Sequence, residues 1–100
     1  IARRGGVIGV IFFSAYHRRG IVGRLEDLLD NLCHLVRVAG AEHVGIGSDM
    51  DGWIWAPLDL PDVSHLPRLT EGLVRRGFSD AEIHGILGGN FLRALTLVRP

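Results

Sequence analysis

Two apolar runs without polar alternation constrain the fold of this chain more than any other feature. The first run occupies residues 7–13 and the second occupies residues 44–47. Continuous apolar runs of this length are typical of strands buried on both faces, as in parallel sheets. A helical pattern separates them, and a strand, helix, strand unit normally has parallel strands and a right-handed crossover. The sequence therefore predicts an α/β fold with a parallel sheet.

The stretch between the two runs predicts one amphipathic helix, from about Arg24 to Ala39, packed outside both strands. Gly40 follows the last apolar position and suits the left-handed closing position of a helix. The apolar positions that recur at helical spacing are Leu25, Leu28, Leu29, Leu32, Leu35, Val36 and Ala39.

The second run ends in two carboxylates, Asp49 and Asp51, which are separated by Met50 and followed by Gly52. In parallel α/β folds, ligands bind outside the carboxyl ends of the strands. An acid at the end of a strand therefore lies where chemistry is usually done, and Asp49 is the first candidate for a catalytic residue. Asp51 is expected instead to brace the following loop through hydrogen bonds to backbone amides.

Length, charge and cysteine content exclude several classes. A complete eight-stranded α/β barrel needs about 250 residues, so 100 residues form one domain or part of one. Zero net charge and scattered arginines argue against a nucleic-acid partner. The run at 7–13 is too short to span a bilayer, so we expect no membrane segment here and favour a cytoplasmic location over an anchor. Cys33 is the single cysteine and is expected to be a buried structural thiol.

The last third of the chain predicts helices. The helical period resumes after Ser64 and ends at Gly77. Ser79 and Glu82 then form a capping box for a further helix. Gly88-Gly89 interrupts the period, and Asn90 is predicted to cap a last short helix. The expected buried positions of the first two helices are Leu66, Leu69, Leu73 and Val74, and Ile83, Ile86 and Leu87.

The histidines and tryptophans leave alternatives open. The five histidines form neither a histidine-X-histidine pair nor an HExxH motif. His17 lies in the loop after the first strand and either touches substrate or is a solvated loop residue. His34 and His43 are expected on the opposite, stability side of the second strand. Trp53 and Trp55 either line a pocket or pin a long loop by aromatic packing.

Five segments of the chain, taken in order, carry a resemblance to a known family. The most specific are the Gly-Ser-Asp-X-Asp-Gly motif at 47–52 and the Gly-Asn-Phe-Leu-Arg run at 89–93. In this pattern the chain resembles the membrane dipeptidase (renal dipeptidase) family of zinc peptidases. The full set of segments comprises residues 5–10, 30–34, 38–52, 62–64 and 87–93.

The resemblance implies a (β/α)8 TIM-type barrel of the metal-dependent amidohydrolase superfamily. Residues 1–100 would be its carboxyl-terminal part: the seventh strand at 7–13, the eighth at 44–47, the helix between them and the carboxyl-terminal helices. In the family, two zinc ions are held by a histidine-X-aspartate pair on the first strand, a bridging glutamate and two histidines on middle strands. None of these positions lies within this chain, so the resemblance places no metal ligand here.

The resemblance also implies a role for Asp49 in cleaving a dipeptide substrate. Asp49 matches the family's acid at the end of the eighth strand, which accepts a proton from the water bridging the metals and passes it to the leaving amine. Met50 stands where the family usually has an aromatic residue. The loop at 56–61 also departs from the family pattern, which puts in doubt the substrate side chains that the mouth of the barrel would accept.

Other function classes fit less well. A calcium-binding EF-hand beginning at Asp49 would need glycine at Ile54 and an acid at Leu60. A helical DNA-binding module conflicts with zero net charge and with glycine pairs in its recognition helix. The serious alternative is a non-catalytic barrel fragment that acts only by association with the missing barrel part, a second copy or another partner chain, because two strands leave unpaired edges.

Overall fold

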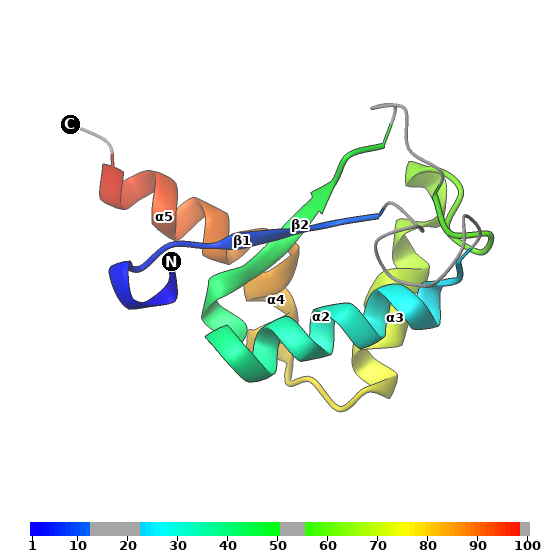
Figure 1. Cartoon of the computed structure of the whole chain (residues 1–100), viewed down its shortest axis with the longest axis horizontal. Helices are drawn as coiled ribbons and strands as arrows, with labels where there is room; N and C mark the ends of the chain where they lie inside the picture. The colour runs from blue at the N-terminus through cyan, green and yellow to red at the C-terminus, as the bar shows by residue number, and fades with distance from the viewer. Residues whose placement is uncertain (13–22, 51–55, 99–100) are drawn as a thin grey trace.

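The computed structural model describes residues 1–12, 23–50 and 56–98. Within them β1 and β2 pair in parallel, and α2 connects the two strands. Figure 1 shows α2 and α3 side by side on one side of the strand pair, with α5 at the opposite end of the molecule. The elements are η1 (Ala2–Arg4), β1 (Ile8–Ile11), α2 (Leu25–Ala39), η2 (Ala41–His43), β2 (Val44–Ser48), η3 (Val63–His65), α3 (Leu66–Arg75), α4 (Asp80–His84), η4 (Gly85–Gly89) and α5 (Asn90–Val98).

The predicted strand, helix, strand unit is confirmed. Ile8 pairs with Val44, Gly9 with Gly45 and Val10 with Ile46. The regular part of β1 is shorter than the run at 7–13, although the Phe12 amide still donates to the Ser48 carbonyl at 2.8 Å. The core lies between one face of the strands and the helices. Its buried hydrophobic residues are Val10, Phe12, Leu25, Leu28, Leu29, Leu32, Val44, Leu60, Leu69, Leu73, Ile83 and Ile86.

The bounds of α2 follow from local hydrogen bonds. At its start, the Asp27 carboxylate accepts from the Arg24 amide at 2.9 Å, and the Asp59 carboxylate accepts from the Leu25 amide at 2.6 Å. At its end, Gly40 has φ 98° and ψ 148°, so it leaves the helix with a positive φ but an extended ψ. The expectation that Gly40 closes the helix in the left-handed helical conformation is therefore wrong, because Gly40 leads with an extended ψ into the short turn η2 that precedes β2.

Asn90 does not cap the last helix. The π-helical segment η4 runs on into α5, and Asn90 has helical torsions of φ −65° and ψ −45°. Its buried side chain turns inward instead, and Nδ2 donates to the carbonyls of Ala41 and Val44, each at 2.7 Å. The prediction was wrong because a capping residue needs non-helical torsions and a side chain free to bond its own helix. Asn90 instead ties the carboxyl-terminal helices to the start of β2.

Several side chains are more exposed than the helical pattern predicted. Leu87 is 44% exposed and Val74 is 58% exposed, so neither belongs to the core. Cys33 is half-buried rather than buried, and its Sγ lies 3.8 Å from Nη1 of Arg76. In the part of the chain that the structure describes, no helix is long and apolar enough to cross a membrane.

An ion-pair network joins α2 to the end of α3. Arg76 contacts Glu26 at 2.7 Å and Asp30 at 2.9 Å, and Arg75 contacts Glu26 at 3.1 Å. The hydrogen bond from Arg76, followed by that from Arg75, lowers the pKa of Glu26 below its ordinary value. The network therefore favours the charged form of Glu26 in the folded state.

Replacing Asn90 by alanine should lower the free energy of unfolding by about 1–3 kcal/mol, the cost of a buried backbone acceptor left unsatisfied. Asn31→Ala is the matched control, because Asn31 is half-buried on α2 and its side chain bonds none of the described residues. The control should change stability by no more than about 0.5 kcal/mol. Urea unfolding followed by circular dichroism measures both, and equal losses in the two variants would contradict the role given to Asn90.

Removing the charge of Glu26 should matter only when that carboxylate is ionised. Because folding lowers the pKa of Glu26, its ion pairs stabilise the fold above the unfolded-state pKa and lose this effect as the pH falls through the folded-state pKa. We expect Glu26→Gln to destabilise the protein at about pH 7 by less than about 1 kcal/mol, since the pair is solvent-screened. The difference from the unmodified protein should shrink as the pH falls through the folded-state pKa of Glu26, which lies below the ordinary value of a glutamate. Glu71→Gln is the control, because Glu71 is exposed and makes no ion pair with the described residues.

Candidate active site

Asp49 lies where the sequence predicted it. It follows Ser48, the last residue of β2, at the carboxyl end of a strand that runs parallel to β1. Its side chain is exposed. Beyond the arrowhead of β2, the chain turns away from β1 (Figure 1). The carboxylate therefore stands at the edge of the sheet where parallel α/β proteins bind their ligands.

The end of β2 carries a β-bulge that the sequence pattern did not predict. Val10 pairs with Ile46, but the next residue of β1, Ile11, pairs with Ser48. Gly47 is therefore an extra residue in β2. Bulges concentrate next to active sites, where they re-aim a side chain.

Two consecutive residues at this strand end have positive φ angles. Ser48 has φ 25° and Asp49 has φ 65°, and they are the only non-glycine residues with positive φ in the described ranges 1–12, 23–50 and 56–98. Such a backbone costs of order 1–3 kcal/mol per residue and persists only where its surroundings hold it. Aspartate tolerates this region better than most residues. The turn that presents Asp49 is thus held in place by the structure around it.

The face of the strands away from the core is lined by glycine. Gly9 and Gly45 pair in register and alternate with Val10 and Val44, which point into the core. A Cβ added to Gly45 would lie 2.3 Å from the Phe91 ring, so the ring rests directly on the backbone of β2. No local sequence pattern indicates this contact, because Phe91 and Gly45 are far apart along the chain.

The structure describes every histidine of the chain except His17. Nδ1 of His43 lies 2.9 Å from the Gly6 carbonyl oxygen, next to the amino ends of both strands, in the structural role predicted for it. His34 is exposed on α2. His17, the candidate substrate contact, lies outside the described residues, as do Asp51, Trp53 and Trp55.

The described residues do not fit a zinc pair by themselves. In 1–12, 23–50 and 56–98, no three His, Cys, Asp or Glu side chains come together in a group that could hold a metal ion. Zinc sites in proteins need at least three protein ligands. Asp49 thus adds a carboxylate to this edge of the sheet, and the described residues place no set of metal ligands around it.

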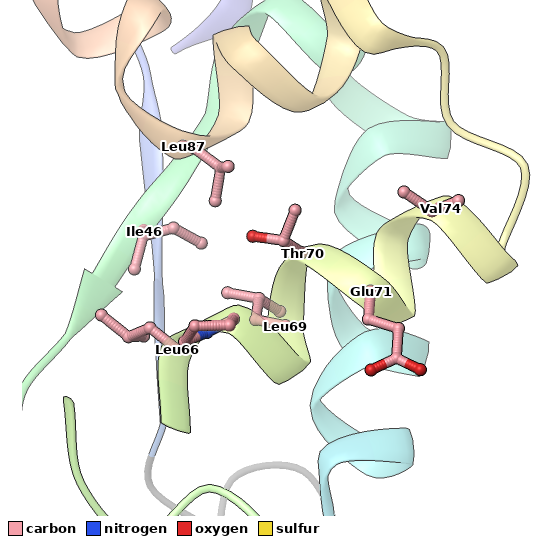
Figure 2. Close-up of a pocket in the computed structure, with 8 residues that line it drawn as sticks. Ile46, Leu66, Leu69, Thr70, Glu71, Val74 and Leu87 are labelled. Atoms are coloured by element: carbon pink, nitrogen blue, oxygen red, sulfur yellow. The ribbon is translucent and has the colours of Figure 1, made fainter. Parts of the chain in front are cut away.

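An apolar groove of about 600 Å³ lies between β2, α3 and η4. Figure 2 shows Ile46 and Leu87 facing Leu66 and Thr70 across it. Leu66, Thr70 and Val74 follow one another at intervals of four residues, so they form a single ridge along α3. The helical pattern assigns Leu66 and Val74 to the core, whereas in the structure both line this groove.

Comparison with known proteins places this chain in a family. The family model for membrane dipeptidases, peptidase family M19, matches residues 1–99. Dipeptidase ataJ of Aspergillus terreus is 38% identical over 105 residues, which cover 98% of this chain and 24% of that protein. The chain therefore spans about a quarter of the length of this curated relative.

Solved structures agree with that match. A metallo peptidase from Rhodobacter sphaeroides, liganded with a phosphinate mimic of the dipeptide L-Ala-D-Ala, is 29% identical with a TM-score of 0.88, covering 96% of this chain and 28% of that one. The probable dipeptidase PvdM from Pseudomonas aeruginosa is 26% identical with a TM-score of 0.85, covering 94% of this chain and 37% of that one.

The parallel strand pair with its outer helices is accordingly the carboxyl-terminal part of a TIM-type barrel of the amidohydrolase type. The family is one of metallopeptidases that act as dipeptidases. From the match along almost its whole length, the chain belongs to the membrane dipeptidase family, peptidase family M19.

Proposed function

We propose that this chain supplies the carboxyl-terminal quarter of a zinc-dependent dipeptidase, and that Asp49 is its proton-transferring residue. The observation that carries the proposal is the position of Asp49: an exposed carboxylate at the carboxyl end of β2, presented by a bulge and a positive-φ turn. Membership of a metallodipeptidase family supports the reaction class.

The proposal divides the chemistry between this chain and the rest of the barrel. Zinc ions, when bound by residues of other strands, lower the pKa of water so that a nucleophile exists at neutral pH. Asp49 supplies what a metal cannot, a carboxylate that accepts a proton and releases it to the leaving amine of the cleaved peptide bond. Its side chain is exposed, which supports access by a substrate.

The substrate class proposed is a dipeptide. It is supported by the Rhodobacter sphaeroides structure, whose ligand mimics the dipeptide L-Ala-D-Ala. His17, which follows β1 in the sequence, is proposed as a residue that touches the substrate. The substrate side chains accepted depend on the loops of the barrel mouth.

A second candidate function is association without catalysis, and the exposed apolar surfaces favour it. The groove in Figure 2 has an almost wholly apolar lining, and Leu92 and Leu95 of α5 are 66% and 57% exposed. In the dipeptidase proposal, the remainder of the barrel covers these surfaces. In the alternative, a partner chain or a second copy covers them. A histidine-X-aspartate motif encoded upstream, after a strand, would favour the dipeptidase proposal over association without catalysis.

Asp49→Asn in the full-length polypeptide keeps the size of the side chain but removes its ability to take a proton. We expect kcat to fall by about 10²–10⁴, the usual contribution of a general acid–base group. KM should change only a few-fold, because the interaction lost is one made in the transition state. Steady-state hydrolysis of a dipeptide, with zinc content measured in each preparation, tests this.

Asp51→Asn is the matched control for that experiment. Asp51 is proposed to brace the loop, so its amide variant should change stability more than kcat. Near-normal turnover of Asp49→Asn at full zinc content would refute the assignment of Asp49.

Residues 1–100 alone should neither hydrolyse dipeptides nor bind zinc tightly, because the proposed metal ligands come from other strands. Calorimetric titration with zinc and a dipeptide hydrolysis assay measure the two properties. Binding of one or two zinc ions at submicromolar affinity would show that this segment holds its own metal centre. It would overturn the proposal that the metal ligands come from the rest of the barrel.

A further inference from the structure

We propose that Gly47, through its close contact with Gly9, is a positioning residue that sets where the Asp49 carboxylate lies. The inference rests on the proposed role of Asp49 and adds to it the feature of the fold that places this side chain. Its basis is the bulge, the backbone contact between the strands and the turn that follows.

Because of the bulge at Gly47, Asp49 lies one residue closer to the amino ends of the strands than it would in a regular register. With Ser48 paired to Ile11, the next residue, Asp49, leaves the sheet beside Phe12. In a regular parallel register Gly47 would take the place opposite Ile11, and Asp49 would lie one residue further along. One residue of strand is about 3.3 Å, so the bulge decides whether the carboxylate reaches a given reacting atom.

Gly47 is required for space rather than for backbone freedom. Its φ is not among the positive values of the described glycines, so an alanine could adopt its conformation. A Cβ at Gly47, however, would lie 3.2 Å from the carbonyl carbon of Gly9 and 3.3 Å from its Cα. A Cβ at Gly9 would lie 3.2 Å from the Cα of Gly47. These neighbours are backbone atoms, so either substitution must move one strand relative to the other.

A shift of β2 at residue 47 would also displace Asp49, because the turn that holds Asp49 follows directly. Ser48 and Asp49 both hold positive φ, and the Ser48 carbonyl is fixed to β1 by the Phe12 amide at 2.8 Å. A shift of β2 at residue 47 therefore moves the anchor of the turn itself. A misplacement of about 1 Å in an active site can cost about 10²-fold in rate.

Gly47→Ala is the test, made in the full-length enzyme. We expect kcat to fall by about 10-fold or more while KM stays within about 3-fold. The added Cβ should shift the strand by a few tenths of an ångström, and a full misplacement of about 1 Å costs about 10²-fold in rate. Gly88→Ala is the matched control, since a Cβ there meets nothing within 4 Å. Gly45→Ala is a second control, because it disturbs the same face of β2 at the Phe91 ring and should lower stability more than kcat.

A double-mutant cycle separates positioning from general damage. If Gly47 acts through Asp49, then Gly47→Ala made in the Asp49→Asn background should lower kcat by less than about 2-fold further, because coupled residues are not additive. An equal loss in both backgrounds, or a Gly47→Ala variant as active as Gly88→Ala, would overturn the proposal. Near-normal turnover of Asp49→Asn alone would instead overturn the proposed function.

Ser48→Gly keeps the test decisive if Gly47→Ala does not fold. Glycine accepts the φ of 25° at this position without strain, so the variant should fold while loosening the turn. We expect kcat to fall several-fold and, again, no further loss in the Asp49→Asn background. Unchanged kcat in Ser48→Gly would contradict the view that a fixed turn places Asp49.

Discussion

The parallel pairing of β1 with β2 is the constraint on which the rest of this structure depends. Glycine at residues 9, 45 and 47 lets the strands and the Phe91 ring approach closely, and the valines between them fill the opposite face. Parallel strands must be joined by a crossover, so the leucine-rich face of α2 is brought over the valine face of the sheet. The core, the direction of β2 and the position of its carboxyl end all follow from this pairing.

The two faces of the strand pair make different contacts. The face with Val10 and Val44 packs against the leucines of α2 and α3, which supplies the hydrophobic contribution to stability. The face with Gly9 and Gly45 is flat at these two positions, and the Phe91 ring from α5 packs against their backbone. The buried hydrophobic contacts therefore lie mainly on one face of the sheet, and Asp49, the proposed catalytic residue, lies at the carboxyl end of β2 rather than on either face.

The exposed apolar surface has a physical explanation in the family assignment. The described residues contain a sheet of only two strands, whereas the relatives are several times longer. Apolar residues on α5 and along the groove between β2 and α3 would be costly in a free surface of this extent. In a barrel, further strands and helices would cover them, which is the arrangement that the proposed function requires.

The position of Asp49 and the helices of the fold follow largely from the local sequence. Asp49 was placed at the end of a strand because the apolar run before it is continuous, and α2 was placed because its leucines recur with the helical period. The Ser79–Glu82 capping box formed as predicted, with both reciprocal hydrogen bonds present at 2.9 and 3.1 Å. Each of these features is decided by neighbours within a few residues.

The sequence by itself thus determined the order of strand, helix and strand, their parallel pairing and the acid at the strand end, because periodicity and local hydrogen bonding encode them. Only the tertiary structure decided the bulge at Gly47, the inward turn of Asn90 and the exposure of Leu87 and Val74. Each of these depends on which atoms from distant parts of the chain come into contact: the backbone of Gly9 against Gly47, and the carbonyls of Ala41 and Val44 against Asn90. No local pattern specifies such contacts, since they exist only once the strands and helices have packed.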